Sequence, residues 1–284
     1  MTLRELLQQG MTALQAISPS ADVDAQYLLL HVLQKPRSYL YSHKDAVPAP
    51  DVIHAFEQLL ARRVGGEPVA YITGSRGFWN LELNCAPSTL IPRSDTESLV
   101  EWILEHSTQP DLALLDLGTG TGAIALALAG ENPSWQVTGV DLRDEAVALA
   151  RQNAQINQIN NADFFRSNWF SALAGKKFHI IVSNPPYIDP HDVHLAQGDV
   201  RFEPRSALVA AENGYADLWH IAQHAPAYLH AGGLLIMEHG FEQGAKTSAY
   251  LTQLGYHDVQ TGKDLTGNDR FTLGYWPSQS LAAG

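Results

Sequence analysis

The run Asp116-Leu117-Gly118-Thr119-Gly120-Thr121-Gly122 decides the fold class of this chain of 284 residues. It ends an apolar stretch over residues 112–117, which has the character of a buried strand, and it opens a helical pattern over 122–130. Glycines let the backbone turn sharply and let a ligand approach it closely. The run therefore predicts an open α/β sheet with a nucleoside-containing ligand at its edge.

Two carboxylates help to identify this ligand. With Ala123, the glycines also satisfy the relaxed dinucleotide fingerprint, so they do not discriminate by themselves. Asp116 lies beside the loop, where it would repel a pyrophosphate but attract the ammonium and sulfonium of S-adenosylmethionine. Asp141, at the end of the next predicted strand, can accept both ribose hydroxyls of either ligand. Asp116 thus favours S-adenosylmethionine over a dinucleotide.

Trp169 follows the third predicted strand, over residues 163–167. Ligands of open α/β sheets bind at the carboxyl ends of the strands, so this ring can lie against an adenine. Packing in the core explains an aromatic residue at this position equally well.

A second motif, Asn184-Pro185-Pro186-Tyr187, follows an apolar run over residues 178–183. The prolines lack an N–H and have a fixed φ, so their carbonyls face outward instead of joining a sheet or helix. The Asn184 side-chain oxygen and a proline carbonyl can then accept both hydrogens of a substrate –NH2 group. Tyr187 can cover the nitrogen with its ring. We predict that Asn184, Pro185 and Tyr187 are catalytic and that all four residues contact the substrate.

Strands and helices alternate from residue 112 onward. We predict strands near 112–117, 135–140, 163–167, 178–183, 233–239, 256–262 and 269–276, and helices near 122–130, 144–157, 214–230 and 241–254. This alternation predicts a mostly parallel sheet of seven strands with helices on both faces. A short turn, Gly267-Asn268-Asp269, joins the last two strands, which should pair antiparallel at one edge.

The earlier part of the chain is different. Helical spacing of apolar residues recurs three times and predicts a small helical domain over residues 1–68. The runs 69–72 and 78–83 indicate a β-hairpin, which we assign to a linker over 69–93. Ser94-Asp95-Thr96-Glu97 has the pattern of a capping box for the next helix and opens a catalytic domain over 94–284.

Composition narrows the possible partners. The 18 basic and 30 acidic side chains leave a net charge of −12, which argues against nucleic acid as a direct partner but not against a protein. Cys85 is the only cysteine, which fits a reducing cytoplasm. The N-terminus lacks a signal-peptide pattern, and no apolar stretch is long enough for a bilayer, so we expect a soluble protein without membrane contact. The 12 histidines lack metal-ligand spacing, so we predict no metal.

The glycine loop and the Asn-Pro-Pro-Tyr motif together resemble those of class I methyltransferases. More narrowly, the chain is similar over nearly its whole length to the peptide chain release factor N(5)-glutamine methyltransferases, the PrmC/HemK family. Leu90-Ile91-Pro92-Arg93-Ser94-Asp95-Thr96-Glu97 and Asp199-Val200-Arg201-Phe202-Glu203-Pro204-Arg205-Ser206-Ala207-Leu208 carry this narrower resemblance. Generic methyltransferases lack the second segment. Ser94 stands where the family usually has proline, a change from which we expect little consequence.

The resemblance implies a class I methyltransferase fold with S-adenosylmethionine as cofactor. It also implies that the substrate is the glutamine of the Gly-Gly-Gln tripeptide in class-1 release factors, and that the N-terminal domain helps to dock that protein. Together with the residue patterns, it predicts cofactor contacts at Asp116, Gly118, Thr119, Gly120, Thr121, Gly122, Asp141, Trp169 and Asn184.

Three other functions stay open. The same clamp would serve an exocyclic amine of adenine or guanine in a nucleic acid, reached by base flipping, although the net charge disfavours it. An NAD(P)-dependent oxidoreductase would use the glycine loop but not the clamp. A non-catalytic adaptor would need neither motif. Arg201 and Glu203 are expected to brace the loop after the clamp, to meet the release factor or to form an exposed ion pair, and Glu238 has no assigned role.

Overall fold

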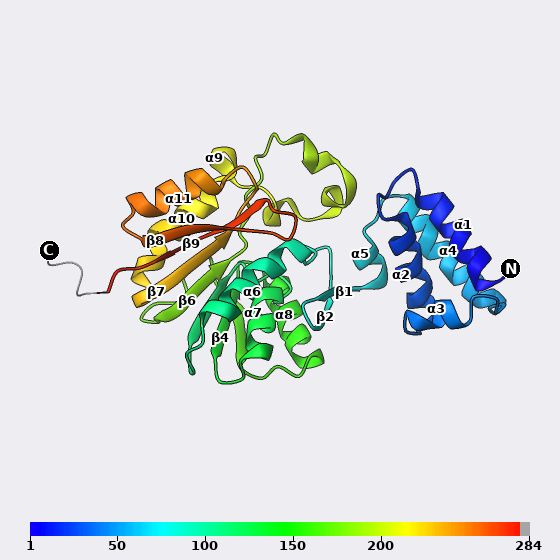
Figure 1. Ribbon diagram of the computed structural model, residues 1–284, viewed down its shortest axis with the longest axis horizontal. Helices are drawn as coiled ribbons and strands as arrows, with labels where there is room; N and C mark the ends of the chain where they lie inside the picture. The colour runs from blue at the N-terminus through cyan, green and yellow to red at the C-terminus, as the bar shows by residue number, and fades with distance from the viewer. Residues whose placement is uncertain (279–284) are drawn as a thin grey trace. The chain divides into compact units, whose positions relative to one another are not determined.

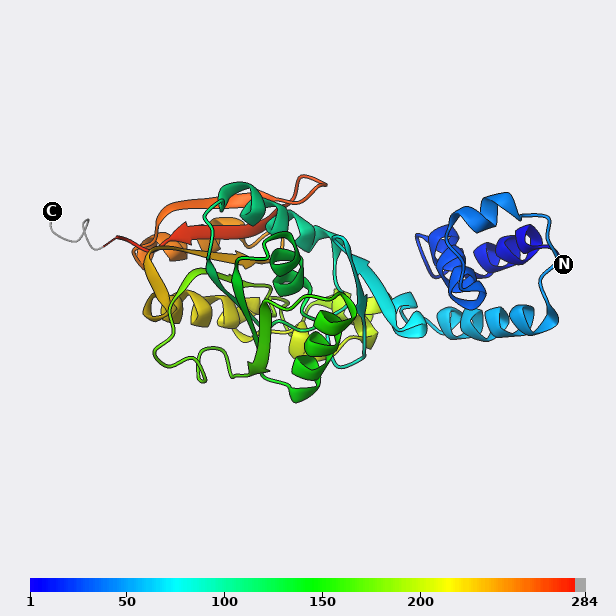
Figure 2. The same ribbon diagram turned by 90° about the horizontal axis from the view of Figure 1, so that it is seen from below.

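The computed structural model describes residues 1–278 (Figures 1 and 2). They form two compact units. The first contains Met1–Ser75 together with Val193–Phe202, and the second contains Arg76–Asp192 and the chain from Glu203 onward. The segment over 193–202 is thus part of the first unit, although it follows the Asn-Pro-Pro-Tyr motif in the sequence.

The first unit is helical. Its helices are α1 (Leu3–Leu14), α2 (Ala21–Leu33), α3 (Ser38–Ser42), α4 (Pro50–Val64) and α5 (Val69–Thr73). They pack around an apolar core in which Leu6, Leu28 and Phe56 are fully buried. The amphipathic spacing predicted three of these helices, and the short α3 has too few residues to show a period.

A buried arginine joins the second segment to these helices. Arg63 of α4 donates from Nε to Asp24 Oδ2 of α2 at 2.8 Å and from Nη1 to Asp199 Oδ1 at 2.6 Å. Asp199 lies in the 3₁₀ helix η3 (Gly198–Phe202), which follows η2 (Val193–Ala196). A buried guanidinium needs such paired carboxylates, because its charge has lost the hydration it would have in water.

The hairpin begins later than the sequence predicted. Residues 69–72 lie in α5, whereas the two strands are β1 (Ser75–Phe78) and β2 (Leu81–Asn84). A short apolar run does not distinguish strand from helix by its period. Here Pro68 precedes the helix, Ile72 is buried in the helical core, and Gly74 ends the turn with a φ of 79°.

The second unit contains a seven-stranded sheet in the order β5-β4-β3-β6-β7-β9-β8. Figure 1 labels β4, β6, β7, β8 and β9 of this sheet. Its strands are β3 (Ala113–Leu117), β4 (Gln136–Asp141), β5 (Ala162–Arg166), β6 (Phe178–Ser183), β7 (Leu229–Glu238), β8 (His257–Lys263) and β9 (Asp269–Tyr275). Only β9 runs antiparallel to both neighbours. The predicted seven-stranded sheet with an antiparallel edge pair is confirmed.

Helices cover both faces of this sheet (Figure 1). One face carries α6 (Glu97–His106), α7 (Ala123–Glu131) and α8 (Asp144–Ile156), and the other carries α10 (Ala216–His224) and α11 (Gly244–Gln253). Successive strand residues alternate between the two cores: Ile180 and Val182 of β6 pack in the first, and Ile181 packs in the second. Both faces are therefore apolar, as in other doubly covered parallel sheets.

The helix predicted over 214–230 is shorter and divided. A single turn, α9 (Ala211–Gly214), precedes α10, which ends at His224. Pro226 lies in the 3₁₀ turn η5 (Ala225–Ala227), and β7 begins soon after it. Proline has no N–H to continue the helical hydrogen bonds, which accounts for the early end of the helix.

The predicted capping box over Ser94–Glu97 is absent from the structure. These residues form a 3₁₀ turn, η1 (Ser94–Thr96), and the start of α6 has no side-chain cap. The Glu97 carboxylate instead accepts the Trp79 N–H at 2.9 Å, and the Thr96 hydroxyl donates to Glu238 at 2.6 Å. Tertiary contacts use the side chains that a local cap would have needed.

Asn153 of α8 offers a test of how the sheet unit holds the glycine loop. It is fully buried, accepts the Asn84 N–H at 2.8 Å and donates to the carbonyls of Thr121 and Asn84 at 2.9 and 3.2 Å. We expect Asn153→Ala to lower the free energy of unfolding by about 1–3 kcal/mol, because buried backbone groups lose their partners.

Urea unfolding followed by tryptophan fluorescence measures this loss, since all six tryptophans lie in the sheet unit. The matched control is Asn160→Ala, which removes an exposed amide and should change the stability by less than about 0.5 kcal/mol. Equal midpoints for the two variants would contradict the assigned role.

Candidate active site

The site begins where the direction of the sheet's connections changes. From β3 the chain proceeds through β4 and β5 toward one edge, whereas from β6 it proceeds through β7 toward the other. Strands β3 and β6 are neighbours, with Leu117 opposite Ser183, and the Ser183 hydroxyl donates to the Leu117 carbonyl at 2.7 Å. The loops that follow the two strands diverge from this point, which is where ligands of open α/β sheets bind.

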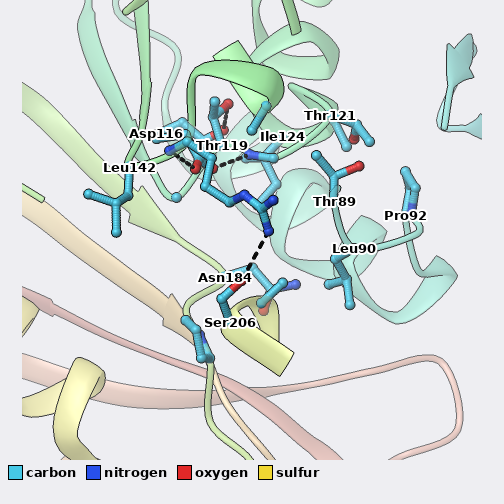
Figure 3. Close-up of a pocket in the computed structure, with 18 of the residues that line it drawn as sticks. Thr89, Leu90, Pro92, Asp116, Thr119, Thr121, Ile124, Leu142, Asn184 and Ser206 are labelled. Atoms are coloured by element: carbon cyan, nitrogen blue, oxygen red, sulfur yellow. Dashed lines mark hydrogen bonds between the residues drawn. The ribbon is translucent and has the colours of Figure 1, made fainter. Parts of the chain in front are cut away.

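A cavity of about 270 Å³ opens at this edge (Figure 3). It lies wholly within the sheet unit. The residues of the predicted site that line it are Asp116, Gly118, Thr119, Gly120, Thr121, Asp141, Trp169, Asn184 and Pro186. Gly122, Pro185 and Tyr187 belong to the same two loops but are not among its lining residues.

The glycine loop is held by the strand beside it. Gly118 and Gly120 have φ values of 69° and 55°, which side chains other than glycine rarely adopt. The Asp141 carboxylate accepts the Gly120 N–H and the Arg143 N–H, both at 3.0 Å. These bonds fix an acid of the second strand against the loop of the first and leave further lone pairs on its oxygens for a ligand.

Asp116 is a buried carboxylate behind this loop. Its Oδ2 accepts the Thr119 hydroxyl at 2.6 Å, but among residues 1–278 no donor reaches its Oδ1 with normal hydrogen-bond geometry, although the Ala125 N–H favours the charged carboxylate. Burial raises the pKa of Asp116 to about 7. A buried acceptor without a donor, beside the cavity, fits a ligand that brings a positive charge or an N–H. The ammonium and sulfonium of S-adenosylmethionine satisfy this requirement.

The Trp169 side chain lies between the cavity and the core. It lines the cavity, and its ring also packs against the second core of the sheet unit. A Cβ placed on Gly118 would lie 3.6 Å from the indole, so the ring covers the first glycine of the loop closely. Its contact with adenine stays a prediction.

The Asn-Pro-Pro-Tyr motif is tied to a neighbouring turn and to β7. Asn184 Nδ2 donates to Thr96 Oγ1 at 3.3 Å, and Thr96 in turn donates to Glu238 Oε2. The Tyr187 hydroxyl donates to Glu238 Oε1 at 3.2 Å, and its ring packs against the second core. The Asn184 amide nitrogen is therefore engaged, which leaves its oxygen for a ligand. The proposed cover of Tyr187 over a substrate nitrogen stays a prediction.

Comparisons with known proteins agree with this geometry. A PrmC N-terminal domain model matches residues 5–74, and a methyltransferase small domain model matches residues 94–203. A release factor glutamine methyltransferase from Vibrio cholerae is 56% identical over 269 residues, 94% of each chain. The one from Escherichia coli is 47% identical over 274 residues, which cover 96% of this chain and 99% of that protein.

This chain belongs to the release factor glutamine methyltransferase family. Such an identity over nearly the full length of both proteins confirms the resemblance seen in the sequence. It also confirms that the chain is a methyltransferase with S-adenosylmethionine as cofactor, and it excludes the oxidoreductase and the adaptor.

Solved structures show the same fold at lower identity. A methyltransferase from Pyrococcus furiosus has a TM-score of 0.53 at 19% identity and covers 78% of this chain and 99% of its own. A 16S rRNA methyltransferase from T. thermophilus, solved in complex with AdoMet and guanosine, has a TM-score of 0.52 at 20% identity, covering 71% of this chain and 49% of its own. None of the helices within residues 1–278 has the length and apolar character needed to span a membrane.

The segment that separates this family from generic methyltransferases is anchored at Glu203. This buried carboxylate accepts the Ile91 N–H at 3.1 Å and forms an ion pair with Arg93. It thereby joins the segment over 203–208 to the turn that precedes η1, and both contribute residues to the cavity wall. Glu203 thus joins the segment that follows the clamp loop to the turn before η1.

Arg201 has a different environment. It is exposed and lies over the Phe202 ring, with 4.9 Å between the guanidinium carbon and the ring centroid. Its Nη2 is 3.5 Å from the Gly65 carbonyl of the helical unit.

Several cavity residues of this family member were not predicted as site residues. Thr96 and Ser206 lie within the two family segments, so their position in those motifs was an available signal. Arg143 and Asp217 also line the cavity, and Arg143 Nη1 reaches Ser206 Oγ at 3.4 Å (Figure 3). Neither belongs to a motif, because they come from a loop and a helix that only the tertiary fold brings to the cavity.

The titration of Asp116 should make the affinity for the cofactor depend on pH. Because its pKa is raised to about 7, the carboxylate becomes ionised as the pH rises through that value. We expect the affinity for S-adenosylmethionine to increase over this interval, by at most about tenfold per pH unit. Asp116→Asn should bind more weakly at pH 8 and lose this dependence.

Isothermal titration calorimetry at several pH values provides the measurement. Asp163→Asn makes the same change at an exposed carboxylate of β5 and should behave as the unmodified protein does. An unchanged pH dependence in Asp116→Asn would refute the assignment.

Proposed function

We propose that this chain transfers a methyl group from S-adenosylmethionine to the side-chain amide nitrogen of a release factor glutamine. The glutamine is that of the Gly-Gly-Gln tripeptide in class-1 peptide chain release factors. The observation that carries the proposal is the Asn184 amide, which lines the cavity with its nitrogen already bonded to Thr96. An amide held in this way offers an oxygen to a planar –NH2 group.

The names of the relatives support this assignment of the substrate. The proteins from V. cholerae and E. coli are both called release factor glutamine methyltransferases, and they match this chain over 94% and 96% of its length. The net charge of −12 agrees with a protein substrate, because a nucleic acid would favour a basic surface. Since release factors act in translation, we place the reaction in the cytoplasm.

Orientation is the main task of the protein in this reaction. An amide nitrogen is a poor nucleophile, since its lone pair is delocalised into the carbonyl. The Asn184 oxygen and the Pro185 carbonyl accept hydrogen bonds from the two N–H groups of the substrate amide and direct its nitrogen lone pair into the cavity. Such positioning replaces a random encounter with a prearranged one and accounts for a large part of the rate enhancement. The bound cofactor supplies an electrophilic methyl group on a sulfonium.

The same acceptors stabilise the charge that develops. Positive charge appears on the nitrogen as the new bond forms, and fixed oxygen dipoles oppose it without having to reorganise. The N–H bonds become more acidic, so the proton is lost after transfer and no strong base is needed beforehand. Asn184 thus acts by orientation and by electrostatics.

We assign the two parts of the chain to two tasks. The helical domain predicted over residues 1–68 docks the release factor, and residues 94–284 bind the cofactor and the glutamine. The predicted linker over 69–93, which contains α5 and the hairpin of β1 and β2, joins the two. The match of residues 5–74 to a domain model specific to this family supports a specific role for the helices. The cofactor contacts at Gly118 to Gly122, Asp141 and Trp169 belong to the same proposal.

Asn184→Ala tests the clamp. We expect turnover to fall by about 100-fold or more, since one of the two aligned acceptors is lost. Affinity for S-adenosylmethionine should fall much less than turnover, because Asn184 is only one of the predicted cofactor contacts and the glycine loop and Asp141 remain. The assay measures transfer of a radiolabelled methyl group to a recombinant class-1 release factor, and a release factor with Gln→Ala in Gly-Gly-Gln should accept none.

Asn160→Ala serves again as the control, because it removes an amide outside the cavity. Near-normal transfer by Asn184→Ala would eliminate the clamp, whereas methylation of the Gln→Ala release factor would eliminate the substrate assignment. Transfer to RNA or DNA, with tight filter binding at physiological salt, would favour the nucleic-acid alternative instead.

Docking by the helical domain makes a separate prediction. A short peptide containing Gly-Gly-Gln can occupy the cavity but cannot reach a distant docking surface. We expect kcat/KM for the intact release factor to exceed that for the peptide by about 100-fold or more, a difference of roughly 2.7 kcal/mol in transition-state stabilisation. Equal values for both substrates would show that recognition is confined to the cavity.

A further inference from the structure

A chain of hydrogen bonds leads from the clamp to a buried acid. Asn184, at the end of β6, donates from Nδ2 to Thr96 Oγ1 at 3.3 Å, and Thr96 of η1 donates to Glu238 Oε2 at 2.6 Å. Thr96 and Glu238 are 4% and 1% exposed, so water does not compete for these bonds. The three residues come from parts of the sequence that share no local pattern.

The charge of Glu238 decides which atom donates in each of these hydrogen bonds. An ionised carboxylate only accepts hydrogen bonds, and a threonine hydroxyl has a single hydrogen to donate. When Thr96 donates that hydrogen to Glu238, its oxygen can only accept from Asn184. Within an amide, only the nitrogen donates. The Asn184 nitrogen is therefore held toward Thr96, and its oxygen is left for the cavity.

We propose that Thr96 and Glu238 are positioning residues, which set the orientation of the Asn184 amide and so decide whether the clamp presents an acceptor or a donor. The proposal rests on the proposed function of Asn184 as the acceptor of a substrate N–H. The ionised Glu238 requires Thr96 to donate its hydrogen, and Thr96 can then only accept from the Asn184 nitrogen. In this proposal both residues act through Asn184.

The surroundings of Glu238 are mixed in charge. Arg270 of β9 faces it but also pairs with Asp264 at 2.9 Å and with Asp95 of η1 at 3.3 Å, so its charge is shared. Asp95 repels the Glu238 charge, and Tyr187 from the clamp loop donates its hydroxyl to Oε1. The next residue, His239, is bonded through Nε2 to Thr272 at 2.8 Å. Glu238 has no full counter-charge of its own in this arrangement.

Protonation of Glu238 allows the donors and acceptors of these hydrogen bonds to reverse. Burial raises the pKa of Glu238 to about 7, so the acid is partly protonated near neutral pH. A protonated carboxyl can donate to Thr96, whose hydrogen is then free to bond the Asn184 oxygen. The amide would turn its –NH2 toward the cavity and oppose the substrate –NH2. The turnover rate therefore falls as the pH decreases through about 7 and is at its maximum above that value.

Two substitutions at Thr96 separate positioning from packing. Thr96→Val keeps the shape but removes the hydroxyl, and we expect kcat to fall by about 100-fold, as for other misplaced catalytic groups. Thr96→Ser restores the hydroxyl and should recover kcat to within about tenfold of the unmodified protein. The dissociation constant for S-adenosylmethionine, measured by calorimetry, should change little in either variant and shows that each is folded.

Glu238→Gln removes the titration but keeps an acceptor. Its amide oxygen can receive the Thr96 hydrogen at every pH. With both substrates saturating, kcat of the unmodified protein should decrease by up to about tenfold per pH unit below pH 7, whereas Glu238→Gln should show no such decrease. Saturation with the cofactor keeps the titration of Asp116 out of the comparison.

A readout without substrate makes the inference independent of the proposed function. The side-chain amide resonances of Asn184, assigned by NMR through their loss in Asn184→Ala, should shift with pH around a midpoint near 7. This shift should be absent in Glu238→Gln. If the unmodified protein does not methylate a release factor, the proposed function fails, and the NMR titration still tests the orientation.

Three results would each overturn the inference. They are an unimpaired kcat in Thr96→Val, an equal loss in Thr96→Val and Thr96→Ser, and the same acid decline or amide titration in Glu238→Gln as in the unmodified protein. Equal loss in the two Thr96 variants would assign Thr96 to packing alone.

Discussion

Strands β3 and β6 lie side by side in register, and the chain leaves them toward opposite edges of the sheet. This pairing places the glycine loop and the Asn-Pro-Pro-Tyr motif one residue beyond Leu117 and Ser183, whose hydrogen bond joins the two strands. The remaining parts of the site depend on it: Asp141 secures the loop from β4, and Thr96 secures Asn184 from η1. A slip of one residue between β3 and β6 would reverse the faces and separate both motifs.

Two buried carboxylates, Asp116 and Glu238, lie behind the two halves of this site. Burial raises the pKa of each to about 7, so the folded state binds their protons more tightly than the unfolded chain does. Their contribution to stability is therefore present at low pH and declines as the pH rises from the unfolded values through about 7. At neutral pH both acids are partly ionised although burial disfavours their charge, and such strongly shifted pKa values are common at functional sites.

The sequence predicted most of what depends on contiguous residues. Both motifs lie directly after strands, so period and composition located Asp116 and Asn184 at the same edge of the sheet. The failures were of two kinds. Residues 69–72 were too few to show a period, and the expected cap at Ser94–Glu97 gave way to tertiary contacts. The bond from Thr96 to Glu238 joins residues 142 positions apart, and a single sequence without a family pattern carries no signal for such a pair.

Asp199 lies four residues before Glu203, yet it belongs to the helical unit and is held there by Arg63. The helical unit is therefore completed by a peptide that the sequence of the catalytic unit supplies. A chimera in which another protein's residues replace only the first 75 would therefore lose Arg63 and leave Asp199 without its guanidinium partner. Replacing these helices without losing that ion pair therefore requires a matched change in the segment over residues 193–202.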